Sequence, residues 1–103
     1  MKPAAYPVPA SMVEMLQTHV SWIFLTDTHA FKIKKPVNFG FLDFSTIDRR
    51  RFYCDEELRL NRRLSPEIYD AVVELRETPA GAAFHGSGAI IDHAVMMKRL
   101  PAD

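Results

Sequence analysis

Two lysines and one glutamate carry the strongest chemical signal in this sequence. Basic and apolar residues alternate over residues 30–35, which predicts a half-buried strand with Lys32 and Lys34 on one face. When residues 46–64 are placed on a helix at about 100° per residue, Glu57 falls near the middle of the apolar face. A buried carboxylate without a partner costs several kcal/mol, so Glu57 requires a cation. A strand lysine paired with a helix glutamate is how kinases hold the lysine against nucleotide phosphates.

The same three residues also have an ordinary structural interpretation. Lys32 and Lys34 could belong to the solvated face of an edge strand, and Glu57 could lie at the rim of a slightly rotated helix. Because a single lysine and a single glutamate occur together often by chance, the pattern alone favours this structural role.

The elements expected around these residues predict an α+β fold. A Pro-rich arm, expected to be flexible, covers residues 1–10, and a single domain covers residues 11–103. The domain should contain a short amino-terminal helix at 11–18, strands at 20–25 and 30–35, a long helix at 46–64, and strands at 68–76 and 89–100. Ser45 and Asp48 would form a capping box at the start of the long helix. The predicted architecture is therefore an antiparallel sheet of about four strands with one long packed helix.

Composition limits the classes of partner. Lys and Arg total 13 and Asp and Glu total 13, and a net charge of zero argues against nucleic acid. The arginines at 49–51, 59, 62 and 63 alternate with acidic residues and predict a solvated, ion-paired helix face. No apolar run is long enough for a membrane span. The single cysteine, Cys54, excludes an internal disulfide and fits a reducing compartment, so a cytoplasmic location is expected.

The histidines and the cysteine are interpreted as structural residues, and one exposed aromatic residue is a candidate contact. The four histidines show no spacing typical of a metal site and are interpreted as turn and strand residues. Cys54 falls on the apolar face of the long helix, which favours a buried structural thiol over a nucleophile. Phe52 falls on the polar face, where an exposed aromatic side chain can mark a contact surface.

Four longer stretches closely resemble one bacterial family. They are residues 19–25 (HVSWIFL), 31–37 (FKIKKPV), 39–46 (FGFLDFST) and 54–64 (CDEELRLNRRL), and residues 94–101 (AVMMKRLP) resemble the family's strand that enters the inter-lobe hinge. The family is that of the aminoglycoside phosphotransferase-like proteins, often described as bifunctional, whose kinase-like domain precedes a P-loop ATP-binding domain. The resemblance implies the amino-terminal, nucleotide-binding lobe of a small-molecule kinase.

The resemblance also implies roles for individual residues. Lys34 would contact the α- and β-phosphates of ATP, and Glu57 would orient it. Met97, Lys98 and Arg99, with the residues up to Pro101, would border the adenine pocket through their backbone groups. In place of a glycine-rich loop the chain has Thr18-His19-Val20-Ser21, so backbone groups or Ser21 would cover the phosphates.

Catalysis is not expected from this chain alone. The sequence contains neither a His-Gly-Asp type catalytic loop nor a later Asp motif for Mg²⁺, and the resemblance places both in a second lobe. ATP binding would then be weak or absent in the isolated chain, and Mg²⁺ would bind only with the missing lobe. The alternatives are a non-catalytic module that self-associates or binds a partner, such as a separate catalytic lobe, and the remnant of a truncated gene.

Overall fold

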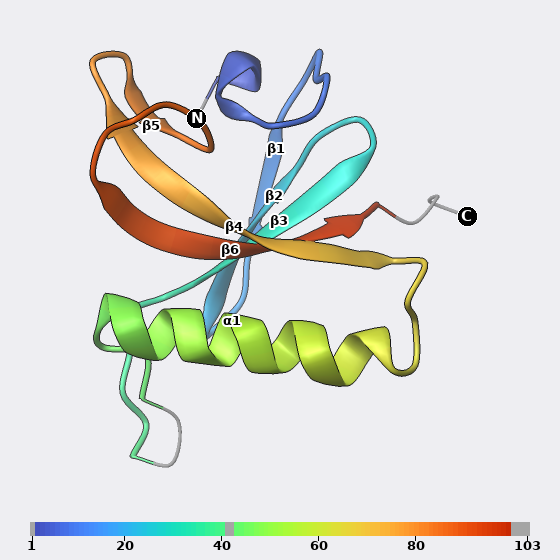
Figure 1. Cartoon of the computed structure of the whole chain (residues 1–103), viewed down its shortest axis with the longest axis vertical. Helices are drawn as coiled ribbons and strands as arrows, with labels where there is room; N and C mark the ends of the chain where they lie inside the picture. The colour runs from blue at the N-terminus through green and yellow to red at the C-terminus, as the bar shows by residue number, and fades with distance from the viewer. Residues whose placement is uncertain (1, 41–42, 100–103) are drawn as a thin grey trace.

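The computed structural model describes residues 2–40 and 43–99, which form one twisted sheet with a helix against it (Figure 1). The chain runs through a short 3₁₀ helix (Pro3–Ala5), β1 (Glu14–Gln17), β2 (Ser21–Leu25), β3 (His29–Lys34), α1 (Ile47–Arg62), β4 (Tyr69–Thr78), β5 (Gly81–Ala83) and β6 (Ile90–Lys98). The helix lies along one face of the sheet, and the amino-terminal segment lies across the other (Figure 1).

All neighbouring strands of the sheet are antiparallel. The six strands follow the order β1-β2-β3-β6-β4-β5, so the last long strand lies between β3 and β4. The register pairs Ser21 with Lys34 and Lys32 with Val95. Because directly opposed residues share a face, Ser21, both β3 lysines and Val95 are on the same side of the sheet.

The main core lies on the side of the sheet opposite the helix. Phe31 is fully buried there, with its ring 5.0 Å from Tyr6 and 5.0 Å from Phe84. Tyr6 and Ala5 come from the amino-terminal segment and are 5% and 8% exposed, so this segment is part of the core. Alternation along β3 sends Phe31 and Ile33 into this core and leaves the lysines on the helix side.

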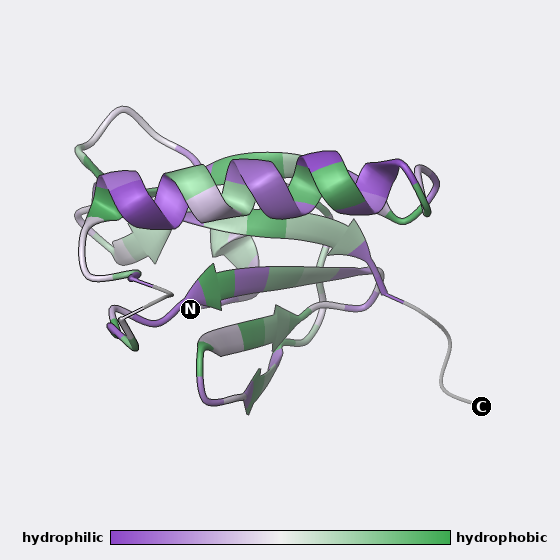
Figure 2. Ribbon diagram, turned by 90° about the horizontal axis from the view of Figure 1, so that it is seen from below, coloured by the Kyte–Doolittle hydropathy of each residue, from purple (hydrophilic) through white to green (hydrophobic). Residues whose placement is uncertain are grey.

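The helix α1 packs against the sheet through a mixed face. Cys54 is fully buried, and its thiol donates to the His93 carbonyl with an S···O distance of 4.0 Å. Hydrophilic residues recur along the whole helix (Figure 2), so few apolar side chains separate it from the strands. Leu60 and Leu64, which the periodicity places on the apolar face, are 49% and 86% exposed. The helix and sheet are therefore held together partly by polar contacts.

The predicted strand count and the predicted amino-terminal helix are wrong. Six strands replace the expected four, and the segment expected as a helix contains β1, which pairs with β2 along its whole length. A helix of eight residues is marginal in water, whereas pairing with β2 satisfies the same backbone groups. β5 falls between the expected strands at 68–76 and 89–100, where Gly81 adopts φ 113° and allows the chain to return along β4. The α+β class agrees with the structure.

The start of the long helix differs by one residue from the prediction. Thr46 is the N-cap, and its hydroxyl accepts a hydrogen bond from the Arg49 backbone N–H at 3.2 Å. Ser45 precedes the cap, so the predicted box between Ser45 and Asp48 does not form. Both residues are cap formers, and sequence alone does not choose between adjacent candidates.

Candidate functional site

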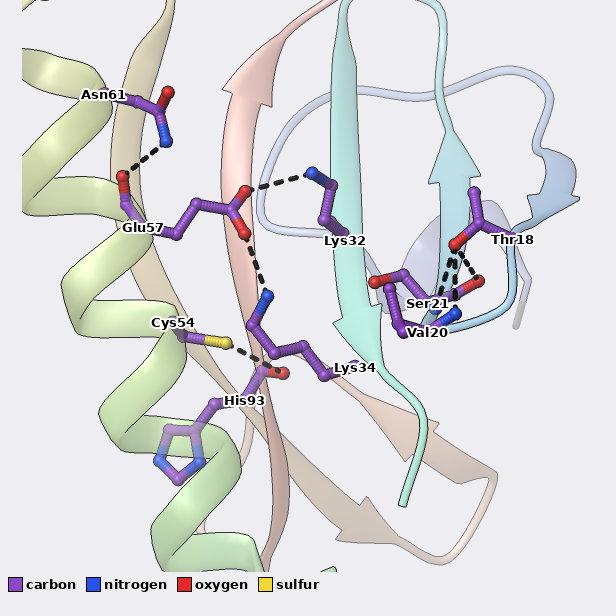
Figure 3. Close-up of polar contacts among 9 residues, drawn as sticks. All are labelled: Thr18, Val20, Ser21, Lys32, Lys34, Cys54, Glu57, Asn61 and His93. Carbon is purple, nitrogen blue, oxygen red and sulfur yellow. Dashed lines mark hydrogen bonds and ion pairs between the residues drawn. The ribbon is translucent and has the colours of Figure 1, made fainter. Parts of the chain in front are cut away.

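A polar cluster of two lysines and one glutamate lies between β3 and α1 (Figure 3). Lys34 Nζ donates to Glu57 Oε1 at 2.9 Å, and Lys32 Nζ donates to Glu57 Oε2 at 3.1 Å. Each carboxylate oxygen therefore has its own lysine. The structure brings Glu57 together with Lys34, the lysine that the resemblance selects, and adds Lys32 as a second partner.

Local structure explains how the three side chains meet. Lys32 and Lys34 are two residues apart on a strand, so both point to the helix side of the sheet. Glu57 lies in the interior of α1, and its backbone carbonyl accepts a hydrogen bond from Asn61 Nδ2 at 2.8 Å. The side chain of Glu57 therefore extends from the helix towards β3, where its carboxylate lies within hydrogen-bonding distance of both lysines.

The cluster has an excess of positive charge in a partly desolvated place. The side chains of Lys34, Glu57 and Lys32 are 9%, 16% and 28% exposed. Burial alone would raise the pKa of Glu57, but the hydrogen bond and charge of Lys34, together with those of Lys32, hold that pKa below its usual value. With the glutamate ionised and two ammonium groups beside it, the cluster carries one uncompensated positive charge and attracts an anion.

Aromatic and polar neighbours fix the more buried lysine. Lys34 Nζ lies 5.3 Å from the centroid of the Phe44 ring, close enough for a cation–π contact. The Phe44 ring in turn packs edge-on against Tyr53, with centroids 4.8 Å apart. Lys34 is therefore enclosed by a carboxylate and an aromatic face, whereas Lys32 keeps more contact with solvent.

Arg50 supports the same region and was missed by the sequence analysis. It is 8% exposed, its Nε donates to Asp92 Oδ1 at 3.1 Å, and its Nη1 donates to the Phe44 carbonyl at 2.9 Å. The expectation of a solvated face for residues 49–51 is wrong at this position. A signal was present, since Arg50 lies four residues before Cys54 and seven before Glu57, and this spacing puts all three on one helix face.

Ser21 lies on the lysine side of the sheet, at the start of β2. It is 1% exposed and stands opposite Lys34 in the register. A tight turn precedes it, in which the Ser21 N–H donates to Thr18 Oγ1 at 3.0 Å and the Thr18 N–H donates to the Ser21 carbonyl at 2.8 Å (Figure 3). This turn is closed by its own hydrogen bonds.

A hollow of about 500 Å³ opens next to the cluster. It is lined by Leu25, Ala30, Asn61, Leu64, Ser65, Ile68, Tyr69, Met97, Lys98 and Arg99. Ala30, Lys32 and Lys34 follow one another on the same face of β3, so the hollow lies beyond Lys32 along the strand. Asn61 joins the two places, because it lines the hollow and also bonds to the Glu57 carbonyl.

Met97, Lys98 and Arg99, which the resemblance places at the adenine pocket, line this hollow. The backbone N–H groups of two of them are hydrogen-bonded within the fold. The Lys98 N–H donates to the Ile68 carbonyl at 2.7 Å, and the Arg99 N–H donates to the Thr28 carbonyl at 2.9 Å. These two N–H groups are therefore committed to the fold. Leu100 and Pro101, which complete the predicted adenine border, lie outside the described residues.

Residues 2–40 and 43–99 contain neither a candidate metal site nor a helix that could span a membrane. No group of three or more His, Cys, Asp or Glu side chains there is placed to hold a metal ion. No helix in that part of the chain has the length and apolar character needed to cross a membrane.

Comparison with known proteins finds relatives whose names state no activity. Uncharacterized proteins of Mycobacterium tuberculosis and Mycobacterium bovis are 35% identical to this chain over 80 residues. The match covers 77% of this chain and 16% of each relative, so the chain spans about one-sixth of the length of these curated relatives. No protein-family model matches the sequence. No solved structure matches it either.

Proposed function

We propose that this chain is the nucleotide-binding lobe of a small-molecule kinase of the aminoglycoside phosphotransferase-like type. The observation that carries the proposal is the cluster in which one carboxylate, Glu57, is shared by Lys32 and Lys34. Two ammonium groups beside one carboxylate leave a net positive charge, and a phosphate chain is an anion that suits it. The sequence resemblance gives the kinase class, which the cluster alone does not specify.

The proposed nucleotide spans the cluster and the neighbouring hollow. Its α- and β-phosphates meet Lys34 and Lys32 while Glu57 orients both ammonium groups, and Ser21 lies on the same face. The base enters the hollow at the side chains of Met97, Lys98 and Arg99, and Leu25 and Ala30 supply apolar surface there. The hollow is open, so the isolated chain buries little of the ligand and binds ATP with a dissociation constant of about 1 mM or weaker.

Phosphoryl transfer is assigned to a larger assembly. The proposed reaction needs a catalytic base and a bound Mg²⁺, which a second lobe supplies when it is present. That lobe belongs either to a longer form of the protein or to a separate chain. The relatives are several times longer than the matched region, which supports the first arrangement.

The test is an ATP titration followed by backbone NMR, with and without Mg²⁺. Saturable shifts should cluster at residues 21, 32–34, 57 and 97–99. Adenosine and tripolyphosphate, titrated separately, should divide these shifts between the hollow and the lysines. Lys35→Gln is the matched control, because Lys35 contacts Gln17 and Trp22 instead of Glu57. Shifts that avoid the lysines and the hollow would refute the nucleotide role.

A second candidate is a non-catalytic module that self-associates. It is favoured by Leu60, in the last turn of α1, and by Leu64, just after the helix, which are 49% and 86% exposed, and by Phe52, which is 57% exposed. Apolar groups this exposed are typical of contact surfaces when they gather in a patch. Light scattering at high concentration separates the candidates, since a strictly monomeric chain contradicts self-association.

A further inference from the structure

His93 is a buried histidine whose side chain has no partner among the described residues. It lies in β6 and is 4% exposed, and neither ring nitrogen makes a hydrogen bond within residues 2–40 and 43–99. Its ring lies beside α1 (Figure 3). A buried polar group without a hydrogen bond is destabilising, so natural proteins rarely retain one that nothing satisfies. His93 therefore calls for a hydrogen-bonding partner that the described residues do not provide.

The imidazole borders a polar cavity. A cavity of about 440 Å³ between α1, β4 and β6 is lined by Arg51, Asp55, Val72, Val73, Glu74, Arg76, Phe84, His85, Gly86 and His93. A second hollow of about 460 Å³ at the first turn of α1 shares only Arg51 and His93 with it. Neither contains Lys32, Lys34 or Glu57, so this place is separate from the lysine cluster.

The charges around His93 balance one another. Arg76 pairs with Glu74 at 2.8 Å, and Arg51 pairs with Asp55 at 3.8 Å. Burial, aided by the positive charge of Arg51, lowers the pKa of His93, so the ring is neutral at pH 7. The lysine cluster has a surplus cation and suits an anion, whereas this cavity has no surplus charge and suits a neutral ligand.

The hydrogen-bonding groups of the imidazole ring limit the chemical class of the ligand further. A neutral imidazole offers one N–H donor and one nitrogen acceptor. Its ligand must therefore both accept and donate, which hydroxyl groups do. Val72, which lies on the same face of the sheet as His93, adds an apolar wall that suits the C–H face of a carbon ring.

We propose that the cavity between α1, β4 and β6 binds a small neutral molecule carrying several hydroxyl groups, such as a sugar or a cyclitol, with His93 as its central hydrogen-bonding partner. The guanidinium and carboxylate groups at the rim serve the outer hydroxyls. The site does not depend on the nucleotide role, since it shares no residue with the cluster or with the hollow beside it.

The test follows the ring nitrogens of His93 by ¹⁵N NMR while D-glucose or myo-inositol is added. Titration to about 100 mM detects a dissociation constant of about 10 mM, which is a weak affinity typical of small ligands. A saturable change in the His93 nitrogen shifts is expected for at least one of the two probes. No change at either ring nitrogen would show that water or the protein satisfies the imidazole, and the proposal would fail.

Two controls define the site and the ligand class. His93→Phe keeps a buried ring, and ligand-induced shifts of the backbone amides of residues 72–74, which the wild type should show, should be absent from it. His19→Phe, at an exposed turn outside the cavity, should leave both the amide and the His93 ring-nitrogen responses intact. Cyclohexanol, with one hydroxyl, should give a much smaller change than myo-inositol. An equal change with cyclohexanol, or with sodium phosphate, overturns the polyhydroxyl assignment. The wild-type titration stands by itself if the phenylalanine variant folds poorly.

Discussion

Lys34 Nζ lies 2.9 Å from Glu57 Oε1, although the two residues are 23 positions apart in the chain. This contact joins the strand that ends the β2–β3 hairpin to the middle of the long helix. Since few apolar side chains of α1 are buried, the ion pair also sets how the helix lies on the sheet. The same geometry that would present an anion site therefore contributes to the stability of the fold.

Glu57→Gln should lower the free energy of unfolding by about 2 kcal/mol. The substitution keeps the side-chain size but leaves two lysines, one of them 9% exposed, without a counter-charge. Urea denaturation followed by circular dichroism measures the change. Glu56→Gln is the control one residue earlier, where the pair with Arg59 lies at the surface and should contribute little. Equal loss in both variants would contradict a structural role for the cluster.

Glu57 should also make the stability of the fold depend on pH in the acid range. Burial alone would raise its folded-state pKa, but the two lysines hold that pKa below the ordinary value for a glutamate. A carboxyl whose pKa is lower when folded stabilises the native state fully above the unfolded pKa, and this contribution is lost as pH falls through the folded pKa. Unfolding free energies measured between about pH 6 and pH 3 should therefore fall less steeply for Glu57→Gln than for the wild type. Parallel curves would mean that Glu57 has an unshifted pKa.

The position of Glu57 could be predicted because it rests on one strong local rule. Alternation along residues 30–35 placed both lysines on one face, and the helical period placed Glu57 towards them. The choice between Lys32 and Lys34 was beyond such rules. Both lysines share a face and differ only in depth, which depends on where Phe44 and the helix come to rest.

Other features depend on contacts that are distant in sequence. Residues 14–17 form a strand because β2 is beside them, while their own apolar pattern resembles a short helix. Tyr6 enters the core although the prolines around it indicate a loose arm, because Phe31 and Phe84 provide a surface for its ring. Arg50 is buried because Asp92, 42 residues later, accepts its hydrogen bond. Local sequence patterns do not encode these partners.

His93→Phe should raise the free energy of unfolding at pH 7 by about 1 kcal/mol in the absence of ligand. It removes two ring nitrogens that lack partners in the described structure and keeps a buried aromatic ring. Burial lowers the pKa of His93 below the ordinary value of about 6.5 for a histidine. The unfolded state therefore binds the proton more readily, and wild-type stability should fall as pH drops below about 6.5.

Denaturant titrations between about pH 7 and pH 5 test this. The phenylalanine variant should lose the His93 part of the pH dependence, in a window above that of Glu57. His19→Phe is the matched control at an exposed position. A variant less stable than wild type at pH 7 would indicate that the imidazole has a favourable partner in the unliganded protein.

Arg50→Leu should destabilise the fold by about 3 kcal/mol. The change leaves Asp92, whose side chain is 15% exposed, without its cation, and it leaves the Phe44 carbonyl without its donor. Thermal or urea unfolding measures the loss. Arg49→Leu removes the neighbouring arginine, which is 58% exposed and pairs with Asp43, and should have little effect. A small loss at both positions would refute the inward role of Arg50.

The two lysines that share Glu57 differ in solvent exposure, so their substitutions should differ in effect on stability. Lys34→Met should cost about 2 kcal/mol of unfolding free energy, because the more buried member of the pair is removed and Glu57 loses its closest cation. Lys32→Met should cost less than about 1 kcal/mol, since Lys32 is 28% exposed and Lys34 still neutralises the carboxylate. Urea denaturation of both variants measures this difference, and equal losses would contradict it.

Because Lys32→Met should remain folded, it can be used to test whether the lysine cluster binds an anion. Removing one ammonium group leaves Lys34 and Glu57 balanced, so the surplus positive charge disappears. Tripolyphosphate binding, followed by NMR shifts, should weaken about tenfold in Lys32→Met, which corresponds to the loss of one charge-assisted contact of about 1.4 kcal/mol. Lys35→Gln should bind as the wild type does, because Lys35 lies outside the cluster. If Lys32→Met and the wild type bind equally, the uncompensated charge of the cluster does not attract the phosphate chain.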